Sequence, residues 1–449
     1  MAILTDPFER AEALKVTHGH WIVASLETHL PWPPRAQVAR YEGREFLLLP
    51  AVIAEGKTPD NPFAAHRLPA IAIETRAHRI SDAQARVEIM RFASALAWHE
   101  YWSLEVVFWT GGNLPRQMGR SVNQPIQGYL DTELLPSPPS EAARTAIALY
   151  REGTSLENPF YAFLSLYKAF SVAIPAIERE SWMARKHELR DERARNRLQE
   201  LESAGRNVGD YLFQEGRHAV AHADREPFVN PDSTDDHFRL RQDVPLMRSY
   251  AEIAIEEALG VPRRQTLWRQ HLYELEGFRA LLPSGIAETL KRGEEVPPDV
   301  TVQFPSEWLI LAARGAEQQP LPGMELVGAR ASAGKVGLMF HSRCEVTELV
   351  VELDFVGERL IFDPLGMMSI RPLRAAPEQI EEEIQAERFR WAMILNGRIE
   401  LWDAESERCL GRSEAYIPVN MMANKAGFDA RIAELEALLP PKGAPATAL

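Results

Sequence analysis

The pattern of apolar and polar positions changes twice along this chain of 449 residues. From about residue 17 to 130, short apolar runs separated by turns surround one stretch of helical spacing, which is typical of α+β structure. Between about residues 140 and 262 the spacing is helical throughout. Strand-like runs return beyond residue 296. The pattern therefore predicts a multidomain α+β chain, with a central all-α bundle between an N-terminal α+β domain and a C-terminal, mainly antiparallel β domain.

The N-terminal domain is expected to span residues 1–134. Its predicted elements are strands at Glu45–Leu49, Ala70–Ile73 and Leu104–Trp109, and a helix from Asp82 to about His99 with Ser81 as its N-cap. The proline-rich segment at residues 134–139 is expected to be a stiff linker, because closely spaced prolines favour extended backbone. The domain boundary is therefore placed there.

The central module is expected to span residues 139–262. Its helix signals are Ser140 as an N-cap, Asn158 followed by Pro159 at the first helical position, a charged helical stretch at Trp182–Glu202, a helix at Val208–His222 and a last helix from Pro245 to Gly260. An acidic loop, residues 232–236, is expected to precede the last helix.

The remaining chain is predicted to form a helical connector at residues 263–295, a β-rich α+β domain at 296–440 and a disordered tail at 441–449. The predicted elements are a hairpin of Arg390–Leu395 and Arg398–Trp402 around Asn396-Gly397, a second hairpin of Val350–Phe355 and Glu358–Phe362, and helices at residues 377–389 and 427–438.

Composition and charge narrow the class of protein. Hydrophobic residues make up 45% and charged residues 25%, as in ordinary globular chains. The N-terminus has no basic and apolar signal segment, and no apolar run reaches the roughly 18 to 20 residues of a membrane helix, so a cytoplasmic protein without membrane contact is expected. The net charge of −14 indicates that any nucleic-acid contact is local or transient. Cys344 and Cys409 are expected to be reduced thiols, a disulfide between them being the alternative.

The residues best suited to chemistry lie in the segment Glu215–Asp224, where Arg217 and His222 are separated by four residues. Composition alone produces such a spacing by chance, so its context matters. Small residues surround the pair, the predicted fold is all-helical, and an upstream helix carries the run Asn158–Lys168 with the sequence NPFYAFLSLYK.

With these features the module resembles the HEPN superfamily, whose signature is Arg, a polar residue, two to four further positions and then His. The polar position is His218 here, where many members have Asn. The same two segments, residues 158–168 and 215–224, also resemble proteins named methylamine utilisation protein MauJ. The HEPN resemblance implies a metal-independent endoribonuclease in a defence or toxin setting, with Arg217, His218 and His222 as site residues, RNA as a transient partner, no cofactor, and a homodimer through the helical module.

The chemistry of the residues fits that implication. A histidine can accept the proton of an RNA 2′-hydroxyl near neutral pH, because its ordinary pKa is about 6.5. An arginine can stabilise charge on phosphate. On a regular α-helix, however, residues five apart, such as Arg217 and His222, do not share a face.

Other interpretations of these residues stay open. His218 and His222, four apart, have the spacing of a two-histidine metal site, although no third ligand stands at a convincing position. Alternatively Arg217 pairs with Glu215, Asp210 or Asp224, and His222 caps the helix end. The competing functions are a non-catalytic dimerisation or binding module and a MauJ-like accessory protein of amine metabolism.

Overall fold

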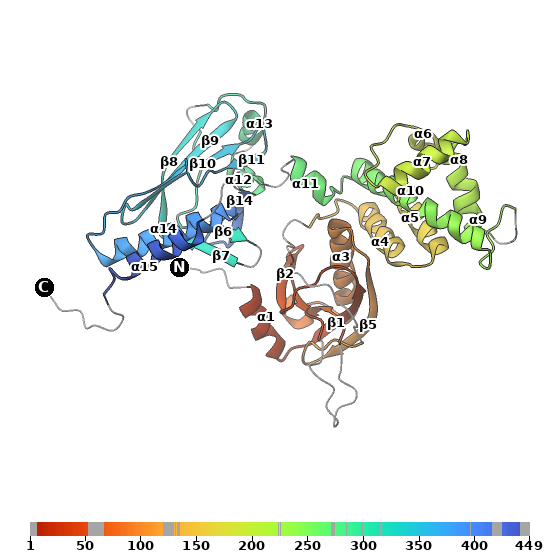
Figure 1. Cartoon of the computed structure of the whole chain (residues 1–449), viewed down its shortest axis with the longest axis horizontal. Coiled ribbons are helices and arrows are strands. Elements are labelled where there is room, and N and C mark those ends of the chain that lie inside the picture. The colour runs from red at the N-terminus through yellow and green to blue at the C-terminus, as the bar shows by residue number, and fades with distance from the viewer. Residues whose placement is uncertain are drawn as a thin grey trace, which may run out of the picture. The chain divides into compact units, whose positions relative to one another are not determined.

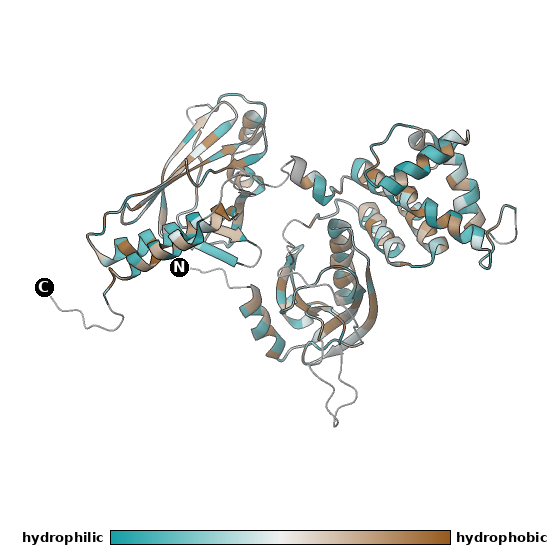
Figure 2. Ribbon diagram, viewed as in Figure 1, coloured by the Kyte–Doolittle hydropathy of each residue, from teal (hydrophilic) through white to brown (hydrophobic). Residues whose placement is uncertain are grey.

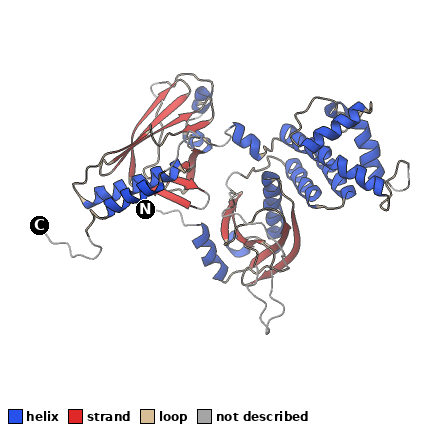
Figure 3. Cartoon of the chain, viewed as in Figure 1, coloured by secondary structure: helices blue, strands red, loops and turns tan. Residues whose placement is uncertain are grey.

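The computed structural model divides the chain into two compact units, one within residues 6–264 and one within residues 265–449. It describes residues 7–52, 67–119, 130, 132, 135–222, 224, 226–270, 274–283, 285–297, 300–314, 317–395, 397–414 and 424–440. The chain is mixed α+β, with antiparallel sheets and one all-helical region, as the apolar pattern predicts (Figure 3).

The first part of the first unit is an antiparallel sheet between helices (Figure 1). The strand order is β2-β3-β4-β1-β5. The elements are α1 (Pro7–Val16), β1 (Trp21–Thr28), β2 (Gln37–Tyr41), β3 (Arg44–Leu49), β4 (Ala70–Glu74), α2 (Thr75–His78), α3 (Asp82–Glu100) and β5 (Leu104–Gly112). The three predicted strands and the predicted helix, capped by Ser81, are confirmed.

The two faces of this sheet bury different helices, because successive strand residues point to opposite sides. On one face Phe92 of α3 stacks on Phe46 of β3, with ring centroids 4.6 Å apart. On the other face Ala11 of α1 packs with Trp21 and Leu47. The sheet is therefore a middle layer.

The helical module follows in the same unit. Its elements are α4 (Glu141–Ser155), α5 (Pro159–Ala173), α6 (Arg179–Met183), α7 (Glu192–Ser203), α8 (Val208–Tyr211), the π-helix η1 (Leu212–His218), α9 (Ala219–Ala221) and α10 (Thr234–Leu259). Ser140 and Asn158 cap α4 and α5 as predicted. Hydrophilic and hydrophobic residues alternate along these helices (Figure 2). The buried core of the module includes Phe163, Phe170 and Tyr250.

Two helix boundaries in the module differ from the prediction. The last helix begins at Thr234 with Ser233 as N-cap, so the predicted acidic loop is partly its first turn and Pro245 lies inside it. Proline in a helix costs about 3 kcal/mol. Burial of Leu240, Leu246, Met247 and other apolar residues on both sides of Pro245 offsets that cost. The predicted charged helix is also interrupted, since residues 184–191 separate α6 from α7.

The helical module packs against the end of α3, so the sheet and the module form one unit. Trp98 of α3 is fully buried in the module's core and its indole Nε1 donates to the carbonyl oxygen of Pro262 at 3.1 Å. Arg264 pairs with Glu100 at 2.6 Å. Arg248 donates to the carbonyl oxygen of Tyr101 at 3.1 Å.

The second unit holds two antiparallel sheets, ordered β11-β10-β9-β8, with β12 on β10, and β14-β13-β6-β7. The strands are β6 (Trp308–Arg314), β7 (Glu317–Leu321), β8 (Met324–Ser332), β9 (Lys335–Ser342), β10 (Thr347–Asp354), β11 (Arg359–Ile361), β12 (Met368–Ile370), β13 (Arg398–Asp403) and β14 (Arg408–Glu414). The helices are α11 (Arg264–Gln270), α12 (Glu276–Leu281), α13 (Ile286–Lys291), α14 (Pro377–Ile394) and α15 (Lys425–Glu436).

The predicted connector contributes to this unit's core, through Leu275, Phe278 and Leu290. The hairpin of β10 and β11 is confirmed, because Leu353 pairs with Leu360 in an antiparallel register. The predicted helices near residues 377 and 427 are also present, as α14 and α15.

The hairpin predicted around Asn396-Gly397 is wrong. Residues 390–394 continue α14, and β13 instead pairs with β6 and β14. Ala386, Phe389 and Met393 recur at helical spacing and are buried, so the helical stripe outweighs the local strand preference of this run. Asn396 itself lies outside the described residues, as does the predicted tail.

Cys344 and Cys409 are both reduced, with no disulfide between them, and both are half-buried. Of the helices within the described residues, none combines the length and apolar character that crossing a membrane requires.

Candidate functional site

The two segments singled out in the sequence, residues 158–168 and 215–224, pack against each other in the helical module. Gly216 lies on the ring of Phe163, and a Cβ placed at Gly216 would come within 2.5 Å of that ring. Phe213 lies beside Tyr167, with ring centroids 6.5 Å apart. The glycine therefore lets η1 approach α5 closely, which makes one structural unit of the two segments.

The helix that carries the motif contains a π-helical segment, η1, where the sequence predicts a regular α-helix. In a π-helix hydrogen bonds join residues five apart, so positions i and i+5 come onto neighbouring turns. Phe213 and His218 are such a pair, and their ring centroids lie 6.4 Å apart. Single π-helical turns are rare and frequent at functional sites.

Ring contacts connect the motif residues to one another through Phe213. The Arg217 guanidinium lies over the ring of Phe213, 5.9 Å from its centroid. His218 and His222, four apart and joined by an α-type bond from the backbone N–H of His222 to the carbonyl oxygen of His218, have ring centroids 4.6 Å apart. The described contacts thus link Arg217 to His222 through Phe213 and His218, without direct contact between the two.

The structure shows the contacts of Arg217 and the position of His222 at the helix end. Glu215, one of the three carboxylates considered as partners of Arg217, pairs with Arg206 at 2.5 Å. Within the described part of the chain, the half-buried Arg217 makes no hydrogen bond and no ion pair. His222 is also half-buried and is the C-cap residue of α9, in agreement with the prediction that it ends the helix.

The two histidines are not joined by further metal-binding groups. Over the residues that the structure describes, no group of three or more His, Cys, Asp or Glu side chains is arranged to hold a metal ion. The pair can still act as two neighbouring imidazoles, each able to accept or donate a proton.

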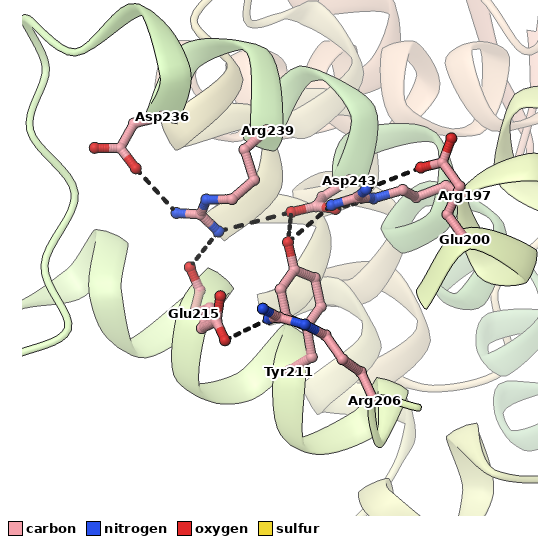
Figure 4. A network of polar contacts seen from close by, with 8 residues as sticks. All are labelled: Arg197, Glu200, Arg206, Tyr211, Glu215, Asp236, Arg239 and Asp243. Carbon is pink, nitrogen blue, oxygen red and sulfur yellow. Dashed lines mark hydrogen bonds and ion pairs between the residues drawn. The ribbon is translucent and has the colours of Figure 1, made fainter. Parts of the chain in front are cut away.

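A polar network fixes the π-helical segment against α7 and α10 (Figure 4). At its centre is Asp243 of α10, whose side chain is fully buried. It accepts hydrogen bonds from Nε of Arg197, at 2.8 Å, and from the hydroxyl of Tyr211, at 2.9 Å. Arg239 lies 3.8 Å from the same carboxylate and donates to the carbonyl oxygen of Glu215 at 2.7 Å.

These contacts hold η1 at both its start and its middle, since Tyr211 precedes it and Glu215 lies within it. Burial raises the pKa of Asp243, and Arg197, Tyr211 and Arg239 oppose that rise. The network residues were not predicted from the sequence. The one available signal was a charged residue, Asp243, on the apolar stripe of α10.

Tyr167 completes the cluster around Phe213. Burial raises the pKa of its hydroxyl, while the positive charges of Arg179 and Arg217 lower it. Two guanidinium groups thus lie near one buried tyrosine that contacts Phe213.

One known protein family matches the helical module. Residues 146–256 match the family described as "Methylamine utilization protein MauJ". The match covers both packed segments, the π-helix and the network, but not the sheets of either unit. No curated protein and no solved structure matches the chain.

Proposed function

We propose that the helical module is a metal-independent endoribonuclease site built on Arg217, His218 and His222. The observation that supports this is an arginine without a hydrogen-bonded or charged partner among the described residues, connected through the Phe213 ring to two imidazoles 4.6 Å apart. A free guanidinium favours a phosphate group, and the two imidazoles supply a base and an acid.

The proposed reaction is attack of an RNA 2′-hydroxyl on the adjacent phosphorus. His222 takes the hydroxyl proton as the new P–O2′ bond forms. The bond from phosphorus to the 5′-oxygen breaks, and a protonated imidazole returns a proton to that oxygen. Arg217 stabilises the charge on the non-bridging oxygens. The products are a 2′,3′-cyclic phosphate and a 5′-hydroxyl. The reaction consumes no water and requires no metal ion.

Cleavage of single-stranded RNA by the full chain is expected to persist in excess EDTA. Arg217→Gln is expected to lower the rate about 10²- to 10³-fold, the usual effect of removing one charge-stabilising donor. Arg330→Gln, at an exposed arginine on β8 in the other unit, is the matched control and should leave the rate unchanged. Loss of cleavage in EDTA, or equal rates for the two variants, would contradict the proposal.

A second candidate is a non-catalytic accessory role in amine metabolism, which the name of the matching family, methylamine utilization protein MauJ, favours. It predicts that the pure protein neither binds nor cuts RNA and that disrupting its gene slows growth on methylamine. An RNA affinity measurement with the wild type and Arg217→Gln separates the two candidates.

We also propose a homodimer through the helical module, in which each chain supplies part of the other's site. Mixing inactive Arg217→Gln and His222→Ala proteins is then expected to restore part of the activity, because some mixed dimers carry one intact Arg–His combination. Light scattering gives the mass in the same samples. A monomer that cuts RNA, with His218 as the acid in the same chain, would overturn the shared site.

Ala219, one of the small residues beside the motif, is buried in the module's own core, so the proposed dimer contact does not include it.

A further inference from the structure

Phe213 is a large apolar side chain that remains partly exposed at the centre of the candidate site. Its neighbours in the chain, Tyr211 and Leu212, are buried, whereas Phe213 is 37% exposed. Its ring lies 6.5 Å from that of Tyr167, 6.4 Å from that of His218 and 5.9 Å from the Arg217 guanidinium. One side of the ring is therefore supported by the protein while part of it faces solvent.

The π-helix is the reason for this position. On a regular α-helix Phe213 and His218, five apart, would lie on different faces. The π-helical hydrogen bonds bring them together, and the network around Asp243 keeps this register by holding Tyr211 and the carbonyl oxygen of Glu215. The fold thus places an aromatic ring next to the Arg217 guanidinium, which has no ionic partner among the described residues, and next to His218 of the histidine pair.

An aromatic ring beside a phosphate-binding cation suits an unpaired nucleotide. Bases of single-stranded RNA stack on aromatic side chains, and each such stack contributes about 1 to 3 kcal/mol to binding. The guanidinium lies 5.9 Å from the ring centroid, so the base and the phosphate of one nucleotide can contact the two groups together. In an A-form duplex the base faces are already stacked and are unavailable to the ring.

We propose that Phe213 stacks on an unpaired nucleobase next to the phosphate bound by Arg217, and that the substrate is therefore single-stranded RNA, such as a loop or bulge. The proposal rests on the ribonuclease function proposed above. Phe213 acts in it as a substrate-stacking residue, and the reacting groups remain Arg217 and the histidines.

The test combines protein variants with altered RNA. Phe213→Leu keeps an apolar side chain but loses the flat ring, and it is expected to weaken binding of single-stranded RNA about 5- to 100-fold. Phe213→Trp should retain binding. Phe108→Leu, at an exposed phenylalanine on β5, is the matched control and should bind like the wild type. Circular dichroism and hydrogen exchange confirm that each variant is folded.

An RNA with one abasic nucleotide at the cleavage position identifies the contact itself. The wild type is expected to lose affinity on this RNA, and Phe213→Leu to lose little more, because the stacking partner is already absent. If the wild type cuts RNA and Phe213→Leu binds and cuts RNA equally well, the stacking contact is overturned while the ribonuclease proposal stands. A wild type that neither binds nor cuts any RNA would overturn the ribonuclease proposal, and the stacking contact with it.

Discussion

Replacing His222 with alanine is expected to slow RNA cleavage by about 10²- to 10⁴-fold, the usual contribution of a general acid or base. His222 ends α9 as its C-cap residue, and its ring contacts that of His218. The backbone N–H of His222, which bonds to the carbonyl oxygen of His218, is retained in alanine. The substitution therefore removes an imidazole with little change to the helix end. Initial rates with saturating RNA measure the effect.

Two comparisons separate chemistry from structure in this experiment. His29 is an exposed histidine that directly follows β1, away from the site. His29→Ala removes its imidazole and should leave the rate unchanged. Added imidazole is expected to restore part of the activity of His222→Ala, because it can enter the space left by the side chain and accept the proton. Undiminished cleavage by a folded His222→Ala protein would remove this residue from the mechanism.

The sequence predicted those elements whose signals are local. Helix starts at Asp82, Glu141 and Pro159 were predicted because each has a capping residue whose side chain bonds the first turn, as the structure confirms. The hairpin of β10 and β11 was predicted because its two apolar runs are adjacent in the chain. Such signals need no knowledge of distant residues.

Elements decided by packing were predicted less well. Residues 390–394 have strand-forming residues, yet they continue α14 because Met393 lies on its buried stripe. Pro245 was expected to begin a helix, but the buried residues on both sides of it keep α10 continuous. In both cases tertiary burial outweighs the preference of a few residues.

In the candidate site, too, residues with a local signal were predicted and a residue that depends on packing was not. Arg217, His218 and His222 were found from their spacing and context. Phe213 was not, because its contact with His218 arises in a π-helical segment, and that segment is contacted by Arg239 and Asp243 more than twenty positions along the chain. A side chain that acts by holding another segment has no spacing signal of its own.

Removing the carboxylate at the centre of the polar network is expected to destabilise the helical module by about 3 to 5 kcal/mol, the usual cost of breaking a buried ion pair. In Asp243→Ala the Nε of Arg197, whose side chain is only 14% exposed, and the hydroxyl of Tyr211 both lose their carboxylate acceptor. Glu200 remains as the anionic partner of Arg197. Because Tyr211 leads into the π-helix, the segment with Arg217 and His222 should open more easily as well.

Native-state hydrogen exchange on the full chain is the appropriate measurement, because it reports the opening of α7, η1 and α10 separately from the other unit. Asp235→Ala is the matched control. Its side chain is exposed in the first turn of the same helix, where a carboxylate contributes about 0.3 to 1 kcal/mol. Faster exchange in η1 for Asp243→Ala, but not for Asp235→Ala, would show that the network maintains the π-helical register. Equal exchange in the two variants would mean that the packing of Gly216 on Phe163 is sufficient to hold the site, and the network would then have no positioning role.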